Sequence, residues 1–235
     1  MTELNMPDMP DEYQSLQHEI VECQICPRLT LHRQQVAGKK RRAYADWDYW
    51  GKPVPSLGEP DARLLIVGLA PGAHGSNRTG RMFTGDKSGE LLFDTLWRFG
   101  FCNQPSSLHR EDGLRLQETY ITAAIHCVPP KNRPATDELA NCRHYLRREL
   151  QLLTNVKVAV ALGSIGWQGL LLALGELGLS IPRPRPAFGH LASCEIAGKI
   201  TLIGCYHPSQ QNTQTGRLTP EMFSAVFARA RELLG

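Results

Sequence analysis

The chain has 235 residues, of which 42% are hydrophobic and 21% are charged, with 26 Lys and Arg against 23 Asp and Glu. This composition predicts one globular domain over residues 1–235 and argues against disorder. No run of about 18 apolar residues occurs, and the acidic first thirty residues are unlike a signal or transit peptide. We therefore expect a cytoplasmic monomer that does not bind a membrane, with residues 1–20 as an N-terminal extension and helix start.

The first helix is predicted from Tyr13 to Cys23, where apolar residues recur at helical spacing and Pro27 favours a stop. The next stretch, residues 28–42, holds six Lys or Arg residues and no acid. We interpret it either as a patch that binds a polyanion such as nucleic acid or as a solvated basic loop. Residues 37–62 combine Gly, Pro and charge with four aromatic residues, which predicts a long ordered loop wrapped over the surface.

Beyond residue 62, predicted strands alternate with predicted helices. The strands are expected at 63–68, 120–127, 156–162 and 199–205, with an edge strand at 192–196, and the helices at 87–99, 137–153, 164–177 and 220–234. Such alternation predicts an α/β fold, a three-layer α/β/α sandwich around a mostly parallel four-stranded sheet. Three polar loops, 69–86, 128–135 and 206–216, follow strand carboxyl ends, where ligands bind in such folds.

The loop after the first long strand is unusually rich in glycine. Gly72, Gly75, Gly80 and Gly85 permit positive φ and close approach of the backbone to a ligand. The loop is not a Walker A phosphate loop, because Gly80 is followed by Arg-Met, and it does not contain G-x-G-x-x-G. Its glycine density favours a ligand-facing loop over a purely structural Ω-loop.

Four polar or aromatic residues in these loops each have two interpretations. Asp86 precedes a helix, so it is either an N-cap or a carboxylate held in a pocket. Phe83 is either a core ring or a stacking platform. His207, fixed by the following proline at a strand end, is either structural or catalytic. Asn132 either forms an Asx-turn or reads a base edge with its amide.

The seven cysteines cannot all pair as disulfides, and their number favours metal binding or buried thiols. Cys23 and Cys26 form a C-x-x-C, and Cys127 and Cys142 bracket a loop and the start of a helix. These four are either unrelated thiols or the ligands of one metal centre. The second pair, Cys127 and Cys142, is widely spaced in the sequence. This spacing suits an iron–sulfur cluster better than zinc, which usually takes two tight pairs.

Taken together, these motifs resemble the uracil-DNA glycosylase superfamily, and in particular its family 5, the UDGb branch. The first motif is G-L-A-P-G-A-H-G-S-N-R-T-G-R at 68–81, which continues through F-T-G-D at 83–86, and the second is H-P-S at 207–209 with Asn212. The resemblance extends from about Cys23 to the last helix. It implies an α/β fold with a four-stranded, largely parallel sheet, and a [4Fe–4S] cluster on the four cysteines Cys23, Cys26, Cys127 and Cys142.

The resemblance also implies that the chain flips uracil out of DNA and hydrolyses its N-glycosidic bond, which starts base excision repair. Hypoxanthine and xanthine are further expected substrates. We expect catalytic roles for Asp86 and His207 and base binding by Phe83, Asn132, Gly72, Ala73 and His74. Contacts to the DNA backbone are expected from Arg78, Arg81, Ser209, Asn212 and Arg217.

Two other functions are compatible with parts of the sequence. A non-catalytic iron–sulfur or zinc protein that binds nucleic acid or senses redox state needs the cysteines and the basic stretch, but not Asp86 or His207. An α/β enzyme that hydrolyses a phosphate or nucleotide would use the glycine-rich loop. It would do so without the Lys-Ser/Thr pair and without a metal-binding pair of carboxylates.

Overall fold

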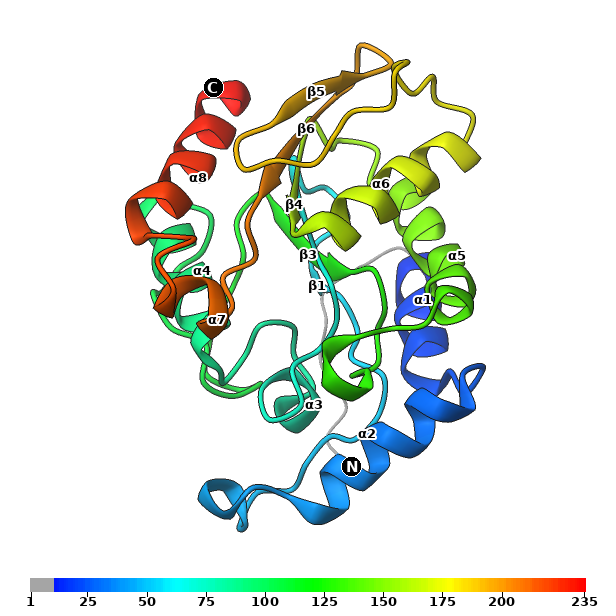
Figure 1. Ribbon diagram of the computed structural model, residues 1–235, viewed down its shortest axis with the longest axis vertical. Coiled ribbons are helices and arrows are strands. Elements are labelled where there is room, and N and C mark those ends of the chain that lie inside the picture. The colour runs from blue at the N-terminus through cyan, green and yellow to red at the C-terminus, as the bar shows by residue number, and fades with distance from the viewer. Residues whose placement is uncertain (1–10) are drawn as a thin grey trace.

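The computed structural model describes residues 11–235, so the first ten residues of the predicted N-terminal extension lie outside the described part (Figure 1). The elements, in chain order, are α1 (Asp11–Glu22), α2 (Pro27–Lys39), η1 (Arg42–Tyr44), β1 (Leu57–Gly58), β2 (Leu64–Gly68), α3 (Ser76–Thr79), α4 (Lys87–Arg98), β3 (Thr119–Ala123), η2 (Pro130–Asn132), α5 (Thr136–Leu152), β4 (Val158–Leu162), α6 (Ser164–Glu176), β5 (Ser193–Ile196), β6 (Ile200–Cys205), α7 (Gln210–Gln214) and α8 (Pro220–Leu234). Within residues 11–235, no helix has both the length and the apolar content needed to cross a bilayer.

One sheet runs through the middle of the molecule, with strand order β1-β3-β2-β4-β6-β5. The four inner strands, β3, β2, β4 and β6, are parallel to one another, as predicted. The sheet has six strands rather than four, because β1 and β5 add antiparallel edges to β3 and β6. Helices cover both faces in Figure 1, with α4 and α8 on one side and α5 and α6 on the other, which confirms the predicted three-layer α/β/α fold.

The two faces of the sheet bury separate hydrophobic cores. Alternate residues of a strand point to opposite faces. Leu64 and Ile66 of β2 therefore pack with residues of α4 and α8, whereas Leu65 and Val67 pack with residues of α5 and α6. All five residues of β2 are buried, which explains why the strand was recognisable as a continuous apolar run.

The segment predicted as a basic loop is largely helical, which corrects that prediction. Pro27 was interpreted as the end of the first helix, but it begins α2, where its missing N–H costs nothing. Arg28 pairs with the buried Glu138 at 2.6 Å, and the buried Arg33 donates from Nη1 to the Gly51 carbonyl at 2.6 Å. These two arginines therefore stabilise the fold, whereas Lys39, Lys40, Arg41 and Arg42 form no ion pair with any of residues 11–235.

The strand predicted at 120–127 is shorter than expected, because β3 ends at Ala123. The backbone still follows β2 beyond this point, since the amides of Ala124 and Ile125 donate to the carbonyls of Gly68 and Leu69. This continuation brings the segment that contains Cys127 and Asn132 alongside the glycine-rich loop.

Candidate active site

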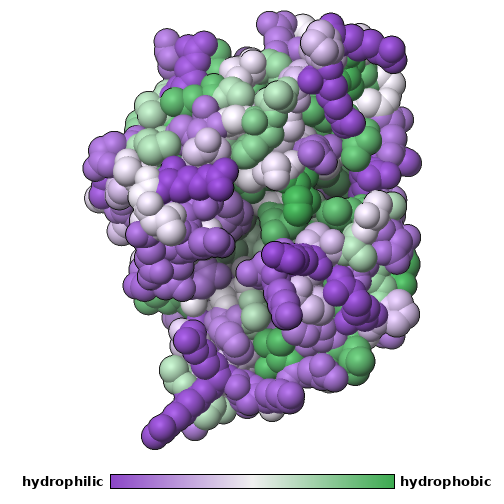
Figure 2. Space-filling model, viewed as in Figure 1, coloured by the Kyte–Doolittle hydropathy of each residue, from purple (hydrophilic) through white to green (hydrophobic). Residues whose placement is uncertain are grey.

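A cavity of about 290 Å³ opens where the three predicted loops meet at the carboxyl end of the sheet. Figure 2 shows the face viewed in Figure 1 hollowed near its centre, with apolar surface inside and hydrophilic surface around it. The cavity is lined by Leu69, Ala70, Gly72, Ser76, Met82, Phe83, Asp86, Ser88, Asn132, His207, Ser209 and Gln211. The loops that the sequence placed at one end of the sheet thus build one site, and Asp86, Phe83, Asn132 and His207 share it.

The two oxygens of Asp86 have different surroundings. Oδ1 accepts a hydrogen bond from the Gly89 amide at 3.0 Å and so caps α4. Oδ2 lies against the glycine-rich loop, because a Cβ placed on Gly72 or Gly75 would stand 2.7 or 2.1 Å from it. Asp86 is therefore both the helix cap and the pocket carboxylate, the two alternatives that the sequence left open.

Burial raises the pKa of Asp86 above its usual value. Backbone hydrogen bonds from Gly89 and Ser88 and the positive charge of Arg78 act in the opposite direction, but they do not cancel the effect. A carboxylate in such a poorly solvated position interacts strongly with nearby charge, because little water screens it.

Phe83 and His207 face each other inside the cavity. The Phe83 backbone has φ +51°, which is unusual for a residue with a side chain, and its ring lies against Gly68 at the end of β2. A Cβ on Gly68 would stand 2.8 Å from the Phe83 ring. The Phe83 and His207 rings are 6.1 Å apart at an angle of 28°. Phe83 therefore belongs to the core on one side and lines the cavity with the other.

His207 lies two residues after the end of β6 and is held by the short helix α7 that follows. The side-chain amide of Asn212 donates to the His207 carbonyl at 2.9 Å. The backbone N–H of Asn212 donates to the Ser209 hydroxyl at 3.4 Å. Burial lowers the pKa of His207 to about 4. The imidazole is consequently neutral near neutral pH and has one N–H to donate.

Asn132 and Arg217 lie at the rim of this region. Asn132 ends η2 with φ +55°, a conformation that Asn tolerates better than most residues, and its side chain lines the cavity. The exposed Arg217 lies over the ring of Tyr206, with 4.8 Å from its guanidinium carbon to the ring centre. Of the predicted backbone-contacting residues, Ser209 lines the cavity and Arg217 is presented to solvent.

Arg78 and Arg81 are only 3% and 7% exposed, which argues against the predicted contacts of these two side chains with the DNA backbone. Arg81 forms a buried ion pair with Asp112 at 2.7 Å. The Arg78 guanidinium lies over the rings of both Tyr44 and Trp47, with 3.9 and 4.0 Å from its central carbon to the two ring centres. Both guanidinium groups hold the glycine-rich loop in shape instead.

Ala73 and His74 are not among the residues that line the cavity, although both were predicted to bind the base. His74 instead shares a hydrogen bond of 3.0 Å between its Nδ1 and the Tyr49 hydroxyl. The sequence also gave no role to Ser88 and Gln211, which do line the cavity. Each lies two residues beyond a predicted site residue, Asp86 or Ser209, and this position was the signal that could have identified them.

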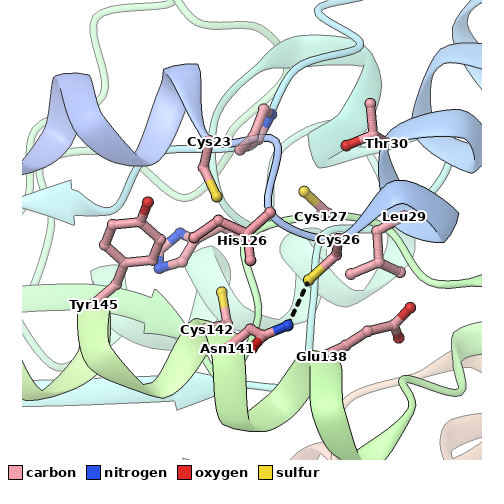
Figure 3. Close-up of a pocket in the computed structure, with 12 residues that line it drawn as sticks. Cys23, Cys26, Leu29, Thr30, His126, Cys127, Glu138, Asn141, Cys142 and Tyr145 are labelled. Atoms are coloured by element: carbon pink, nitrogen blue, oxygen red, sulfur yellow. Dashed lines mark hydrogen bonds between the residues drawn. The ribbon is translucent and has the colours of Figure 1, made fainter.

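The four predicted metal-binding cysteines line a second cavity (Figure 3). Cys23 follows α1, Cys26 precedes α2, Cys127 follows β3 and Cys142 lies on α5. Figure 3 shows the four sulfur atoms pointing toward a common space. The fold therefore gathers four thiols that are far apart in the sequence, whereas Cys102, Cys194 and Cys205 lie elsewhere.

Burial raises the pKa of Cys127 to about 12 and that of Cys142 well above its usual value. The nearby Arg33 lowers the pKa of Cys127, and the other thiols of the group raise both values. Across residues 11–235, no group of three or more His, Cys, Asp or Glu side chains is arranged to hold a metal ion. In an iron–sulfur cluster each thiolate binds a different iron, so four ligands need not converge on one ion.

Comparison with known proteins identifies the family. Residues 55–231 match the model of the uracil DNA glycosylase superfamily. A type-5 uracil-DNA glycosylase of Mycobacterium bovis is 49% identical over 214 residues, which are 91% of this chain and 78% of that protein. The type-5 enzyme of Thermus thermophilus is 48% identical over 91% of this chain and 94% of its own length. That of Pyrobaculum aerophilum is 44% identical over 93% of this chain and 92% of its own length. The chain therefore belongs to the uracil DNA glycosylase superfamily, within its type-5 family.

The close contact between Asp86 and the glycine-rich loop leads to a testable prediction. Gly72→Ala adds a Cβ 2.7 Å from Oδ2 and must displace the carboxylate. A displacement of about 1 Å can cost roughly 100-fold in rate, so we expect a loss of that order in turnover on the substrate proposed below. Gly38→Ala is the matched control, because a Cβ there meets nothing within 4 Å. Equal turnover of the Gly72→Ala and Gly38→Ala variants would contradict the prediction.

Proposed function

We propose that this chain is a uracil-DNA glycosylase, which flips uracil out of DNA and hydrolyses the bond between the base and deoxyribose. The observation that carries the proposal is the cavity in which a carboxylate, a neutral imidazole, an aromatic ring and an amide face one another. The names of the type-5 relatives support the same activity. Hypoxanthine and xanthine, which also result from deamination, are further proposed substrates.

Phe83 and Asn132 are the proposed base-binding residues. Flipping a base costs a few kcal/mol, and least at a mismatch, so a damaged pair is already favoured. Stacking on the Phe83 ring recovers roughly 1–3 kcal/mol. The Asn132 amide carries both donors and an acceptor, which suits the alternating donor and acceptor groups along the edge of uracil.

Asp86 is proposed to act on the sugar side of the bond that breaks. The leaving base takes the bonding electrons, so positive charge develops on the sugar before water adds to its anomeric carbon. A carboxylate about 4 Å from that charge contributes roughly 4 kcal/mol at an effective dielectric near 20. Oδ2 also accepts a proton from the attacking water, which orients the water oxygen toward the sugar.

His207 is proposed to act on the base side. Negative charge develops on the leaving uracil and is delocalised onto its carbonyl oxygens. A fixed N–H donor stabilises charge that is present only in the transition state, and no rearrangement is needed when it forms. Because burial keeps the imidazole neutral, it donates a hydrogen bond rather than a proton.

The overall proposal is tested with an oligonucleotide that contains a single uracil, incubated without added metal or nucleotide. Alkali then cleaves the strand wherever a base has been removed, and a shortened strand is the expected product. An intact strand would favour the non-catalytic iron–sulfur protein, for which the four thiols are the specific observation. Oligonucleotides with hypoxanthine or xanthine measure the proposed breadth.

Asp86→Asn separates the two roles of this residue. Asparagine caps helices about as well as aspartate, so the thermal unfolding midpoint should change little. Turnover should fall by about 100-fold or more, because the negative charge near the sugar is lost. Binding of uracil-containing DNA, measured by fluorescence anisotropy, should persist. Undiminished turnover would remove Asp86 from the mechanism.

The pH dependence of turnover tests the proposed protonation states. Asp86 must be ionised, and burial raises its pKa, so activity should fall as pH decreases through that raised pKa. His207 must be neutral, and its pKa of about 4 keeps it so at higher pH. We therefore expect no histidine titration in kcat between about pH 6 and pH 8. A decline in kcat above about pH 6.5 would instead indicate a protonated imidazole in the mechanism.

We also propose that Cys23, Cys26, Cys127 and Cys142 hold a structural [4Fe–4S] cluster. Four soft sulfur donors suit such a cluster, and Arg33 beside Cys127 offsets the negative charge that bound thiolates would carry. Cluster binding would join α1, α2 and α5 through ligands from both sides of the cavity. The cluster would supply folding stability, while the chemistry at the sugar stays with Asp86 and His207.

The cluster is tested by replacing one ligand and one unrelated cysteine. Cys142→Ser should lose iron and visible absorbance and lower the thermal unfolding midpoint, because structural metal binding contributes to folding. Cys194→Ser, on strand β5 away from the cavity, should keep both. Stoichiometric zinc in a colourless wild-type protein would overturn the cluster and leave the glycosylase proposal intact.

A further inference from the structure

The last residue of α2 and the chain that follows it toward β1 carry a group of cations that do not line the cavity. We name residues 39–47 the basic arm. Lys39, Lys40, Arg41 and Arg42 lie in it, and within residues 11–235 none of the four forms an ion pair, in contrast to Arg28. Figure 1 shows this segment extending beyond the end of α2 at the lower edge of the molecule, and Figure 2 shows hydrophilic side chains projecting there.

The basic arm is attached to the glycine-rich loop by aromatic and hydrogen-bond contacts. The Arg78 guanidinium lies over the rings of both Tyr44 and Trp47 of the arm. The Tyr49 hydroxyl, just beyond the arm, lies 3.4 Å from the Arg41 amide and 3.0 Å from Nδ1 of His74. These contacts give the arm a defined orientation relative to the cavity.

Arg78 extends this attachment to the proposed catalytic carboxylate. Its Nε donates to the His74 carbonyl at 2.7 Å, and its Nη2 donates to the Gly85 carbonyl at 2.9 Å. Gly85 has φ +78°, and a Cβ there would stand 2.4 Å from Nη2, so only glycine accommodates the guanidinium. Because Asp86 is the next residue, two contacts separate the arm from the carboxylate.

We propose that the basic arm binds backbone phosphates of the DNA on one side of the lesion while the cavity holds the flipped base. The proposal rests on the proposed function and names where the rest of the substrate lies. The arm carries four cations against the single acid Asp46, and three of the four, Lys39, Arg41 and Arg42, are exposed. Such a surplus of cations that form no ion pair with residues 11–235 complements a phosphate backbone. Trp47 remains 36% exposed beside them and offers an apolar edge to the sugar. A fixed arm places phosphate and base at a constant separation, which a flexible tail cannot do.

The test compares two matched double variants. Arg41→Gln with Arg42→Gln removes two arm charges, and Arg183→Gln with Arg185→Gln removes two exposed charges from the loop after α6. KM for a uracil-containing duplex is measured from low to moderate salt. Each lost phosphate contact reduces the slope of log affinity against log salt by about 0.9, so the arm variant should lose about 1.8. Its KM should rise far more than its kcat falls, and the control should match the wild type.

Truncated duplexes locate the contact. Two duplexes are used, one that ends shortly 5′ of the uracil and one that ends shortly 3′ of it. One of the two lacks the phosphates that the arm would contact. On one of the two truncated duplexes, the arm variant and the wild type should have equal KM. An arm variant with the wild-type salt slope, or a control variant with the same loss, would overturn the proposal. If the wild-type protein excises no uracil at all, the proposed function fails instead, and the two failures are thereby distinguished.

Discussion

The contact between the Asp86 carboxylate and the glycine-rich loop is the constraint on which the site depends. One oxygen caps the N-terminus of α4, and the other lies where any side chain at Gly72 or Gly75 would collide with it. Helix α4 is in turn fixed by buried residues such as Phe93 and Leu96. The position of the carboxylate is thus set by the hydrophobic core, and Gly72 and Gly75 leave room for it.

Burial acts in opposite chemical directions on the two proposed catalytic groups. It raises the pKa of Asp86 and lowers that of His207, since in each case it disfavours the charged form. The same poorly solvated surroundings strengthen any interaction with charge that develops between them. A site with one acid and one neutral imidazole can therefore stabilise opposite charges on the sugar and the base without exchanging a proton between its own groups.

Much of this arrangement could be predicted from the sequence, because buried parallel strands are continuous apolar runs and their loops meet at one end. The edge strand β1 has only two residues and carries no periodic pattern. Proline occurs both after the ends of helices and at their first position, so Pro27 alone does not reveal that it begins α2. The burial of Arg78 and Arg81 was also unpredictable, because their partners Tyr44, Trp47 and Asp112 lie about thirty positions away in either direction along the chain.

The two antiparallel edges of the sheet have a consequence for the behaviour of many copies of the chain. Without β1 and β5, the outermost strands would be β3 and β6, whose unpaired backbone groups could template strand addition from another copy. The four residues of β5 include the exposed Ser193 and Glu195, and a charged residue on a short edge discourages such pairing. The short antiparallel edge strands should therefore protect the folded protein against aggregation when many copies are bound close together on the same nucleic acid.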